Sequence, residues 1–341
     1  MSDQVHQDEE IYQKASIQAL SKGPSSLQSH SNGPWRELSE GADCMLGLPK
    51  ELSWEMVDEL TQGFRTRIPA YENGDYLAYE GLRPVNGTKV TVKRYTGEWR
   101  TMLEREKKAA VSMHHKNILR LTAFYDGEVT AVLVFPLTIR GTLHTNLYGS
   151  MGNLKLKFQQ KLKIAIDIAR GLRYMHEECP QGPVIHGNLL ITNIFLRNDL
   201  SPMISGFGRA KWLHLKQAKP ISNENQRPSL RDYLDHDAIA LVKSDVLSYG
   251  VLLLRLFCKS SALQDDKTLI EWARPKVMKR AFHELLDEDW EDADMHEMFK
   301  VMCSAFQCTM SSPDMRPCMS AVISYLKGEN LMVMQTSPSF D

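Results

Sequence analysis

Strand-like segments and helix-like segments occupy different parts of this 341-residue chain. Short β-rich runs begin with "DYLAYEGL" and end with "TAVLVFPL" at about Pro136, and one helical pattern at about 98–113 interrupts them. Beyond that point apolar residues recur at helical spacing, as they do from Phe158 to His176. This order predicts an α+β fold in which a small β-rich lobe is followed by a larger helical lobe.

The composition of the two ends sets the expected domain boundaries. Residues 1–45 are rich in Ser, Gln, Glu and Gly-Pro pairs, which predicts a disordered polar extension. The folded domain is expected at 46–328, with the β-rich lobe at about 60–136 and the helical lobe at about 137–328. Residues 329–341 are then a C-terminal tail.

Charge and apolar patterning exclude several classes of partner. The formal net charge is -1, which gives no electrostatic reason to expect nucleic acid or an anionic membrane. The longest apolar run, Val246–Cys258, is too short to span a bilayer and contains Arg255. The six cysteines have no metal-ligand spacing, so they are expected to be reduced, mostly buried thiols. A cytoplasmic protein without a membrane anchor is predicted.

One stretch has the spacing of a phosphotransfer centre. "PVIHGNLLITNIFLRNDLSPMISGFGRAKWL", beginning at Pro183, follows the pattern H-R-D-L-x-x-x-N and then D-F-G. "VTVK" precedes it, and "KSDVLSYGVLLLRL" and "PDMRPCMSAVISYL" follow it in the same order as in kinases. Together these motifs resemble the Pelle-related branch of plant receptor-like kinases, over about residues 50–328. The resemblance implies a bilobal kinase fold with a nucleotide cleft between the lobes.

Three catalytic positions depart from that pattern. Asn188 stands in place of the Asp that accepts the substrate proton, and losing a general base typically costs about 10²- to 10⁴-fold in rate. Gly206 stands in place of the Asp that holds magnesium and offers no side-chain oxygen. Leu190 replaces the Lys that meets the transferred phosphate in Ser/Thr-type members. We therefore predict neither a catalytic residue nor a metal site.

The phosphate-covering loop is also altered. The resemblance places Tyr71, Asn73 and Tyr76 at the three glycine positions, although a shifted alignment would keep Gly74 as one of them. Glycines there let backbone N–H groups approach the phosphates closely. Two tyrosines are expected instead to occupy or cover the cleft.

The region that would bind a peptide substrate lacks its usual parts. No A-P-E sequence follows Trp212, and Asp237 is nearest to the Glu that the resemblance pairs with Arg316. Gly187 replaces the Arg that would bind an activation-loop phosphate. Asp245 matches an Asp that braces the catalytic loop.

Three positions retain the residues of a nucleotide cleft. Lys93 corresponds to the phosphate-binding Lys, and its expected partner is Glu106, which lies on a helical stripe of inward-facing residues. That stripe consists of Trp99, Met102, Leu103, Ala109, Ala110 and Met113. The pair either braces the helix against the sheet or holds a nucleotide, and both roles remain open. Asn193 is a candidate ligand for a second metal, although one neutral amide is a poor site for a hard cation.

These observations predict an inactive receptor-like pseudokinase that acts as a scaffold or allosteric partner. Its expected partners are proteins, an active receptor kinase or an immune receptor complex that recruits it to the plasma membrane. No cofactor is required, and ATP binding is expected to be weak and independent of magnesium. One alternative is a weak Ser/Thr-type kinase that uses Lys93 and Asn193. Another is a nucleotide sensor that binds ATP without metal.

Overall fold

The computed structural model describes residues 48–71, 76–84, 86–95, 99–136, 140–148, 156–215, 234–258, 265–285 and 295–329. The predicted extension at 1–45 and the tail beyond Glu329 lie outside these ranges. The described residues up to Pro136 are called the sheet lobe below, and those from Arg140 onwards the helical lobe. The predicted α+β fold, strands first and helices afterwards, is confirmed.

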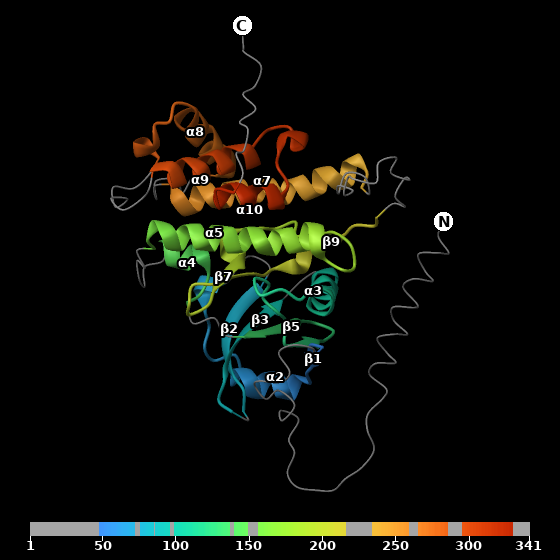
Figure 1. Ribbon diagram of the computed structural model, residues 1–341. Helices are drawn as coiled ribbons and strands as arrows, with labels where there is room; N and C mark the ends of the chain where they lie inside the picture. Colours follow the sequence, from blue (N-terminus) through green and yellow to red (C-terminus); the bar gives the residue numbers. More distant parts are fainter. Residues whose placement is uncertain are drawn as a thin grey trace. The chain divides into compact units, whose positions relative to one another are not determined.

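The sheet lobe contains a five-stranded sheet whose strand order is β1-β4-β5-β3-β2 (Figure 1). Its strands are β1 (Lys50–Glu51), β2 (Tyr76–Leu82), β3 (Lys89–Tyr95), β4 (Ala123–Asp126) and β5 (Ala131–Pro136). Neighbouring strands are antiparallel except β1 and β4, which are parallel. The sequence did not reveal β1, because a two-residue strand has no periodicity.

Each face of the sheet is covered by one helix. The strand register aligns one row of side chains on the same face, namely Ala78, Lys93, Leu133 and Phe124. Helix α3 (Arg100–Ser112) packs on that face, where the Lys107 ammonium lies 4.7 Å from the centre of the Phe124 ring. Helix α2 (Trp54–Thr61) packs on the opposite face, where Leu60 approaches Gly81. The face that carries Lys93 is therefore the one turned toward α3.

The helical lobe is built around α5 (Phe158–Arg173), which continues into a π-helical turn at Tyr174–Glu178. Figure 1 shows α5 between the sheet and the remaining long helices. These are α7 (His236–Phe257), α8 (Asp266–Met278), α9 (Met295–Cys308) and α10 (Met319–Leu326), with the short α4 (Leu143–Tyr148) beside α5. The apolar stripe predicted from Phe158 to His176 forms the buried face of α5.

Short elements connect the long ones and position the candidate site. The two-stranded ribbons are β6 (Val184–Ile185) with β9 (Lys211–Trp212), and β7 (Ile194–Leu196) with β8 (Pro202–Ile204). The single 3₁₀ turns are η2 (Pro69–Tyr71), η4 (Ile191–Asn193), η5 (Phe207–Arg209), η7 (Phe282–Glu284) and η8 (Pro313–Met315). The two ribbons hold the loop at 186–193 next to the segment at 205–208.

The backbone of β8 joins the two lobes. The Ile204 N–H donates to the Asn117 carbonyl at 2.8 Å, and the Ile204 carbonyl accepts from the Leu119 N–H at 2.8 Å. Of the described cysteines, only Cys318 is exposed, and all are free thiols. No described helix is long and apolar enough to cross a bilayer.

Candidate functional site

Asp245 on α7 organises the loop that carries the degenerate H-R-D motif. Its carboxylate accepts hydrogen bonds from the His186 N–H at 2.7 Å and the Gly187 N–H at 2.9 Å. His176 contacts the same carboxylate at 2.9 Å from the π-helical turn. Burial raises the pKa of Asp245, but its interactions with His176 and His186 together outweigh burial and leave the pKa below its ordinary value. The bracing role predicted for Asp245 is confirmed.

His186 links this loop to the segment at 205–208. Burial lowers the pKa of His186, which favours a neutral imidazole. In that form Nδ1 accepts from the Asn188 N–H at 3.1 Å and Nε2 donates to the Ser205 carbonyl at 3.0 Å. The frame of a kinase catalytic loop is thus held in place by buried hydrogen bonds.

The degenerate positions Asn188 and Gly206 lie on either side of Asn193. The Asn193 amide donates to the Asn188 carbonyl at 2.9 Å, and the Asn193 carbonyl accepts from the Ser205 N–H at 2.8 Å. Gly206 has a φ of +85°, and a Cβ added there would lie 2.8 Å from Cγ of Asn193. The Asn193 side chain therefore occupies the space into which a carboxylate at position 206 would project.

These residues do not match a magnesium site of the kind that the resemblance implies. Gly206 supplies no oxygen, and the nearly buried Asn193 amide is already engaged by the loop backbone. Among the described residues, no three His, Cys, Asp or Glu side chains converge on a common point that could hold a metal ion. Leu190, which replaces the phosphate-contacting Lys, is 46% exposed.

Lys93 does not form the expected ion pair with Glu106. Its ammonium is buried, and within the described part of the chain it donates no hydrogen bond. Instead it lies 4.3 Å from the ring centre of Tyr76, 5.3 Å from that of Phe135 and 5.6 Å from that of Phe195. Sequence analysis missed Phe135 and Phe195, because nothing in a strand pattern reveals which rings converge on a distant side chain.

Glu106 faces inward as the helical stripe predicted, but it contacts the segment that follows Gly206. Its carboxylate accepts hydrogen bonds from the backbone N–H groups of Phe207 and Gly208. Burial raises the pKa of Glu106 to about 7, although the charge of Lys93 and these two N–H groups act in the opposite direction. The two side chains are coupled by charge without a direct contact, and Glu106 fastens α3 to η5.

The two described tyrosines of the altered loop line the cleft. Tyr76 begins β2 and covers the Lys93 ammonium. Tyr71 in η2 packs edge-on against Phe195 of the helical lobe, with ring centres 5.3 Å apart and planes at 89°. Asn73 and Gly74 lie outside the described residues. The expectation that tyrosines occupy or cover the cleft is met by Tyr71 and Tyr76.

The expected ion pair of the substrate platform is replaced by backbone contacts. Arg316 donates to the carbonyls of Met310 at 2.8 Å, Lys243 at 2.9 Å and Ser311 at 3.3 Å. Asp237 is fully exposed in the first turn of α7, where its carboxylate lies 4.0 Å from the exposed ring of His236. Arg316 therefore ties α7 to η8 without the carboxylate that the resemblance implies.

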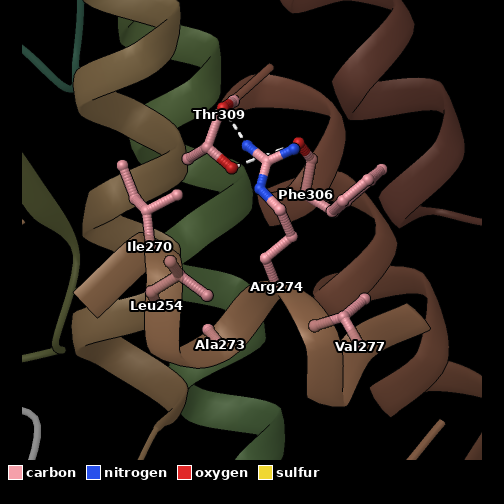
Figure 2. A pocket seen from close by; sticks show the side chains of 7 residues that line it. All are labelled: Leu254, Ile270, Ala273, Arg274, Val277, Phe306 and Thr309. Carbon is pink, nitrogen blue, oxygen red and sulfur yellow. Dashed lines mark hydrogen bonds between the residues drawn. The ribbon is translucent and has the colours of Figure 1, made fainter. Parts of the chain in front are cut away.

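Two hollows lie in the helical lobe, away from this cleft. The first, between α7, α8 and α9, has a volume of about 10 Å³, enough for about one water molecule (Figure 2). Arg274 closes it by donating to the Thr309 carbonyl at 2.9 Å while its guanidinium lies over Phe306. This hollow is part of the packing between helices.

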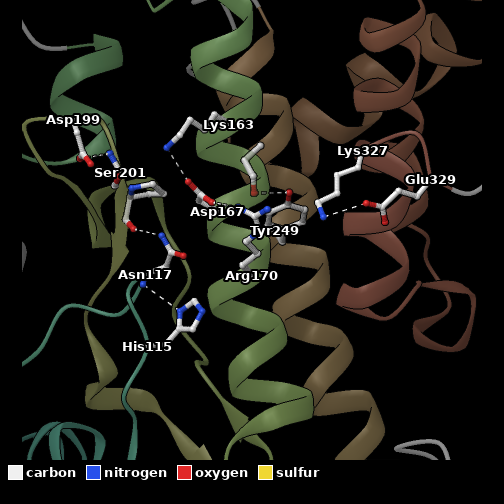
Figure 3. A network of polar contacts seen from close by, with 12 residues as sticks. His115, Asn117, Lys163, Asp167, Arg170, Asp199, Ser201, Tyr249, Lys327 and Glu329 are labelled. Carbon is white, nitrogen blue, oxygen red and sulfur yellow. Dashed lines mark hydrogen bonds and ion pairs between the residues drawn. The ribbon is translucent and has the colours of Figure 1, made fainter. Parts of the chain in front are cut away.

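The second hollow, of about 260 Å³, follows one face of α5 beside the end of α10. Lys163 and Arg170 on its rim both bond Asp167, at 3.1 and 2.6 Å (Figure 3). Lys327 on the other side pairs with Glu329 at 3.2 Å. Each cation therefore has a carboxylate partner, but Lys163 and Arg170 share that of Asp167.

Comparison with known proteins settles the family. Residues 57–326 match the family described as protein tyrosine and serine/threonine kinase. The chain belongs to this kinase family. It is 28% identical over 306 residues to the LRR receptor kinase SERK2 of Oryza sativa subsp. japonica, covering 84% of this chain and 49% of that protein.

Other relatives are receptor-like kinases of Arabidopsis thaliana. The proline-rich receptor-like protein kinase PERK8 is 28% identical over 330 residues, with coverage of 90% of this chain and 47% of PERK8. The G-type lectin S-receptor-like serine/threonine-protein kinase RLK1 is 30% identical over 262 residues, with coverage of 74% and 31%. This chain spans about half the length of the first relatives, and the predicted resemblance to plant receptor-like kinases is confirmed.

Proposed function

We propose that this kinase-family domain is a pseudokinase, which transfers no phosphate and acts in signalling by binding other proteins. The observation that carries the proposal is the glycine at position 206, where an added Cβ would lie 2.8 Å from Cγ of Asn193. The position that should present a carboxylate to magnesium has none, and the Asn193 side chain lies where that carboxylate would project. Magnesium neutralises charge on the phosphates in this chemistry, so its loss removes a main source of catalysis.

Two further features support the same proposal. Asn188 can hydrogen-bond a substrate hydroxyl but cannot accept its proton. Lys93, the residue that would neutralise nucleotide phosphates, is enclosed by aromatic rings. Any ATP binding is therefore proposed to be weak and independent of magnesium, with no cofactor required.

The partner we propose is an active receptor-like kinase or an immune receptor complex. Hydrogen bonds of Asp245 to the loop at 186–193 and of Glu106 to η5 hold a kinase frame together, and we propose that its outer surfaces are recognised by a relative. We place the protein in the cytoplasm, where its partner recruits it to the plasma membrane.

A phosphotransfer assay with a matched control tests the proposed loss of activity. The full chain is incubated with magnesium, radiolabelled ATP and a general protein substrate, beside Lys93→Met as the blank. No incorporation is expected from either protein. Incorporation by the wild type that Lys93→Met abolishes would refute the proposal, because it would require a working phosphate-binding Lys.

A second experiment tests the proposed partner. The chain is used to capture receptor-like kinases from its native tissue, and each captured kinase is purified. The kinase rate is then measured with and without the added chain. A reproducible change in the rate of one kinase is expected, and unchanged rates for every captured kinase would contradict an allosteric role.

A further inference from the structure

The surroundings of Lys93 are contributed by both lobes. Tyr76 on β2 and Phe135 on β5 belong to the sheet lobe, whereas Phe195 on β7 belongs to the helical lobe. The ring centres lie between 4.3 and 5.6 Å from the ammonium, and all three rings are buried. We call Tyr76, Phe135 and Phe195 the aromatic cage.

The ammonium has no hydrogen-bond partner among the described residues. Lys93 is 1% exposed, and Glu106 is engaged by the backbone of Phe207 and Gly208. A buried charge without a hydrogen bond is strongly disfavoured unless another interaction compensates. The electron-rich faces of aromatic rings attract a cation at these distances. The aromatic cage therefore helps to compensate for burying Lys93, beside the charge coupling to Glu106.

A second contact across the lobes supports the cage from outside. Tyr71 of the sheet lobe packs edge-on against Phe195, which fixes the position of that ring. Gly141 makes room for this arrangement, because a Cβ there would lie 2.8 Å from the Tyr71 hydroxyl oxygen. The φ of Gly141 is +72°, which also disfavours other residues. Tyr71 of the sheet lobe and Gly141 of the helical lobe thus both contribute to the position of Phe195.

We propose that Lys93 is the internal ligand of the aromatic cage, so that the chain closes its own cleft and holds the two lobes together without a nucleotide. The inference rests on the proposed function, since an active kinase would need this ammonium for phosphates. Among the described residues these three rings surround the ammonium, so a phosphate that binds Lys93 would displace one of them. The cleft would then act as a fixed joint between the lobes, and partner proteins would meet one arrangement of the domain.

A double-mutant cycle tests whether the ring and the ammonium interact. Lys93→Met keeps the approximate length of the side chain and removes its charge, and Phe195→Leu keeps an apolar side chain and removes the ring. Unfolding equilibrium constants of the full chain are measured in urea for the wild type, both single variants and the double variant. We expect the effect of Lys93→Met to differ about fivefold between the wild-type chain and the Phe195→Leu variant, a modest value for a cation–ring contact because the Phe195 ring centre lies 5.6 Å from the ammonium.

Phe257→Leu is the matched control, because Phe257 is equally buried but packs against Phe158 inside the helical lobe. The effect of Lys93→Met should be the same with and without Phe257→Leu. Additive effects of Lys93→Met and Phe195→Leu would overturn the proposal. Should Phe195→Leu fail to fold, Phe135→Leu replaces it in the cycle with the same expectation.

Hydrogen exchange tests the connection between lobes without altering Phe195. In Lys93→Met, amides of β7 in the helical lobe should exchange faster, while those of α9 stay unchanged. Unchanged exchange in β7 would show that Lys93 does not hold the lobes together. Neither experiment uses ATP, so both test the aromatic cage independently of phosphate transfer. Kinase turnover would refute the proposed function, whatever the outcome of these two experiments.

Discussion

The buried carboxyl group of Glu106 makes the stability of this domain depend on pH in an unusual direction. Burial raises its pKa from an ordinary 4.5 to about 7 in the folded state. The folded state therefore binds this proton more tightly than the unfolded state does. The stabilisation is fully present below about pH 4.5 and is lost as pH rises through about 7.

The expected size of the effect follows from the two pKa values. One pKa unit corresponds to about 1.36 kcal/mol, so the difference between 4.5 and about 7 lowers the free energy of unfolding by about 3 kcal/mol at high pH. Glu106→Gln removes the titrating group, and its amide oxygen can still accept from Phe207 and Gly208. The free energy of unfolding of Glu106→Gln, relative to wild type, should therefore rise by about 2.5 kcal/mol between pH 5 and pH 8, because part of the loss has already occurred at pH 5.

Urea unfolding at a series of pH values between 5 and 8 measures this difference. Glu104→Gln is the matched control, because Glu104 lies on the same helix but is 64% exposed and paired with Lys107 at 2.9 Å. Exposed pairs contribute little, so its stability curve should run parallel to that of the wild type. A constant difference between Glu106→Gln and wild type at every pH would refute the buried, protonatable state of Glu106.

Two other expectations follow from the same site. In the wild type the charge of Lys93 lowers the pKa of Glu106, so this pKa should rise further in Lys93→Met. The loss of stability should then occur at higher pH in the same titration. An unchanged midpoint would contradict the coupling between the two side chains. The double variant Asn188→Asp/Gly206→Asp should melt at a lower temperature than Asn188→Asp alone, since position 206 has a φ of +85° and a Cβ there meets Asn193. We expect the strained backbone at position 206 alone to lower the free energy of unfolding by roughly 1–3 kcal/mol. We also expect the double variant to transfer no radiolabelled phosphate. Robust transfer would show that the loss of activity rested on these two residues.

The sequence predicted the frame of the site well, because local patterns determine it. The helical stripe around Glu106 correctly placed that carboxyl group on the inner face of α3. The resemblance to receptor-like kinases likewise predicted that Asp245 braces the catalytic loop, and its carboxylate accepts hydrogen bonds from the backbone of His186 and Gly187. The first inference depends on residues within one helix, and the second on a match to the motifs of a known family.

The partner of Lys93 could not be predicted in this way. Its environment is formed by rings from β2, β5 and β7, which are brought together only when the two lobes pack. The contact of Glu106 with η5 also depends on the packing of the two lobes. Helix α3 is held beside η5, because Met102 lies against Gly208 and Arg105 donates to the Gly208 carbonyl at 3.3 Å. A pair expected from motifs alone was therefore replaced by contacts between distant segments.

Calorimetric titration of the full chain with ATP, in the presence and in the absence of magnesium, tests the central claim most directly. Without a carboxylate at position 206 and with Lys93 enclosed, we expect no binding tighter than millimolar and equal heats under both conditions. Binding in the micromolar range that appears only with magnesium would contradict the account, because it would require a metal site and an accessible phosphate-binding Lys.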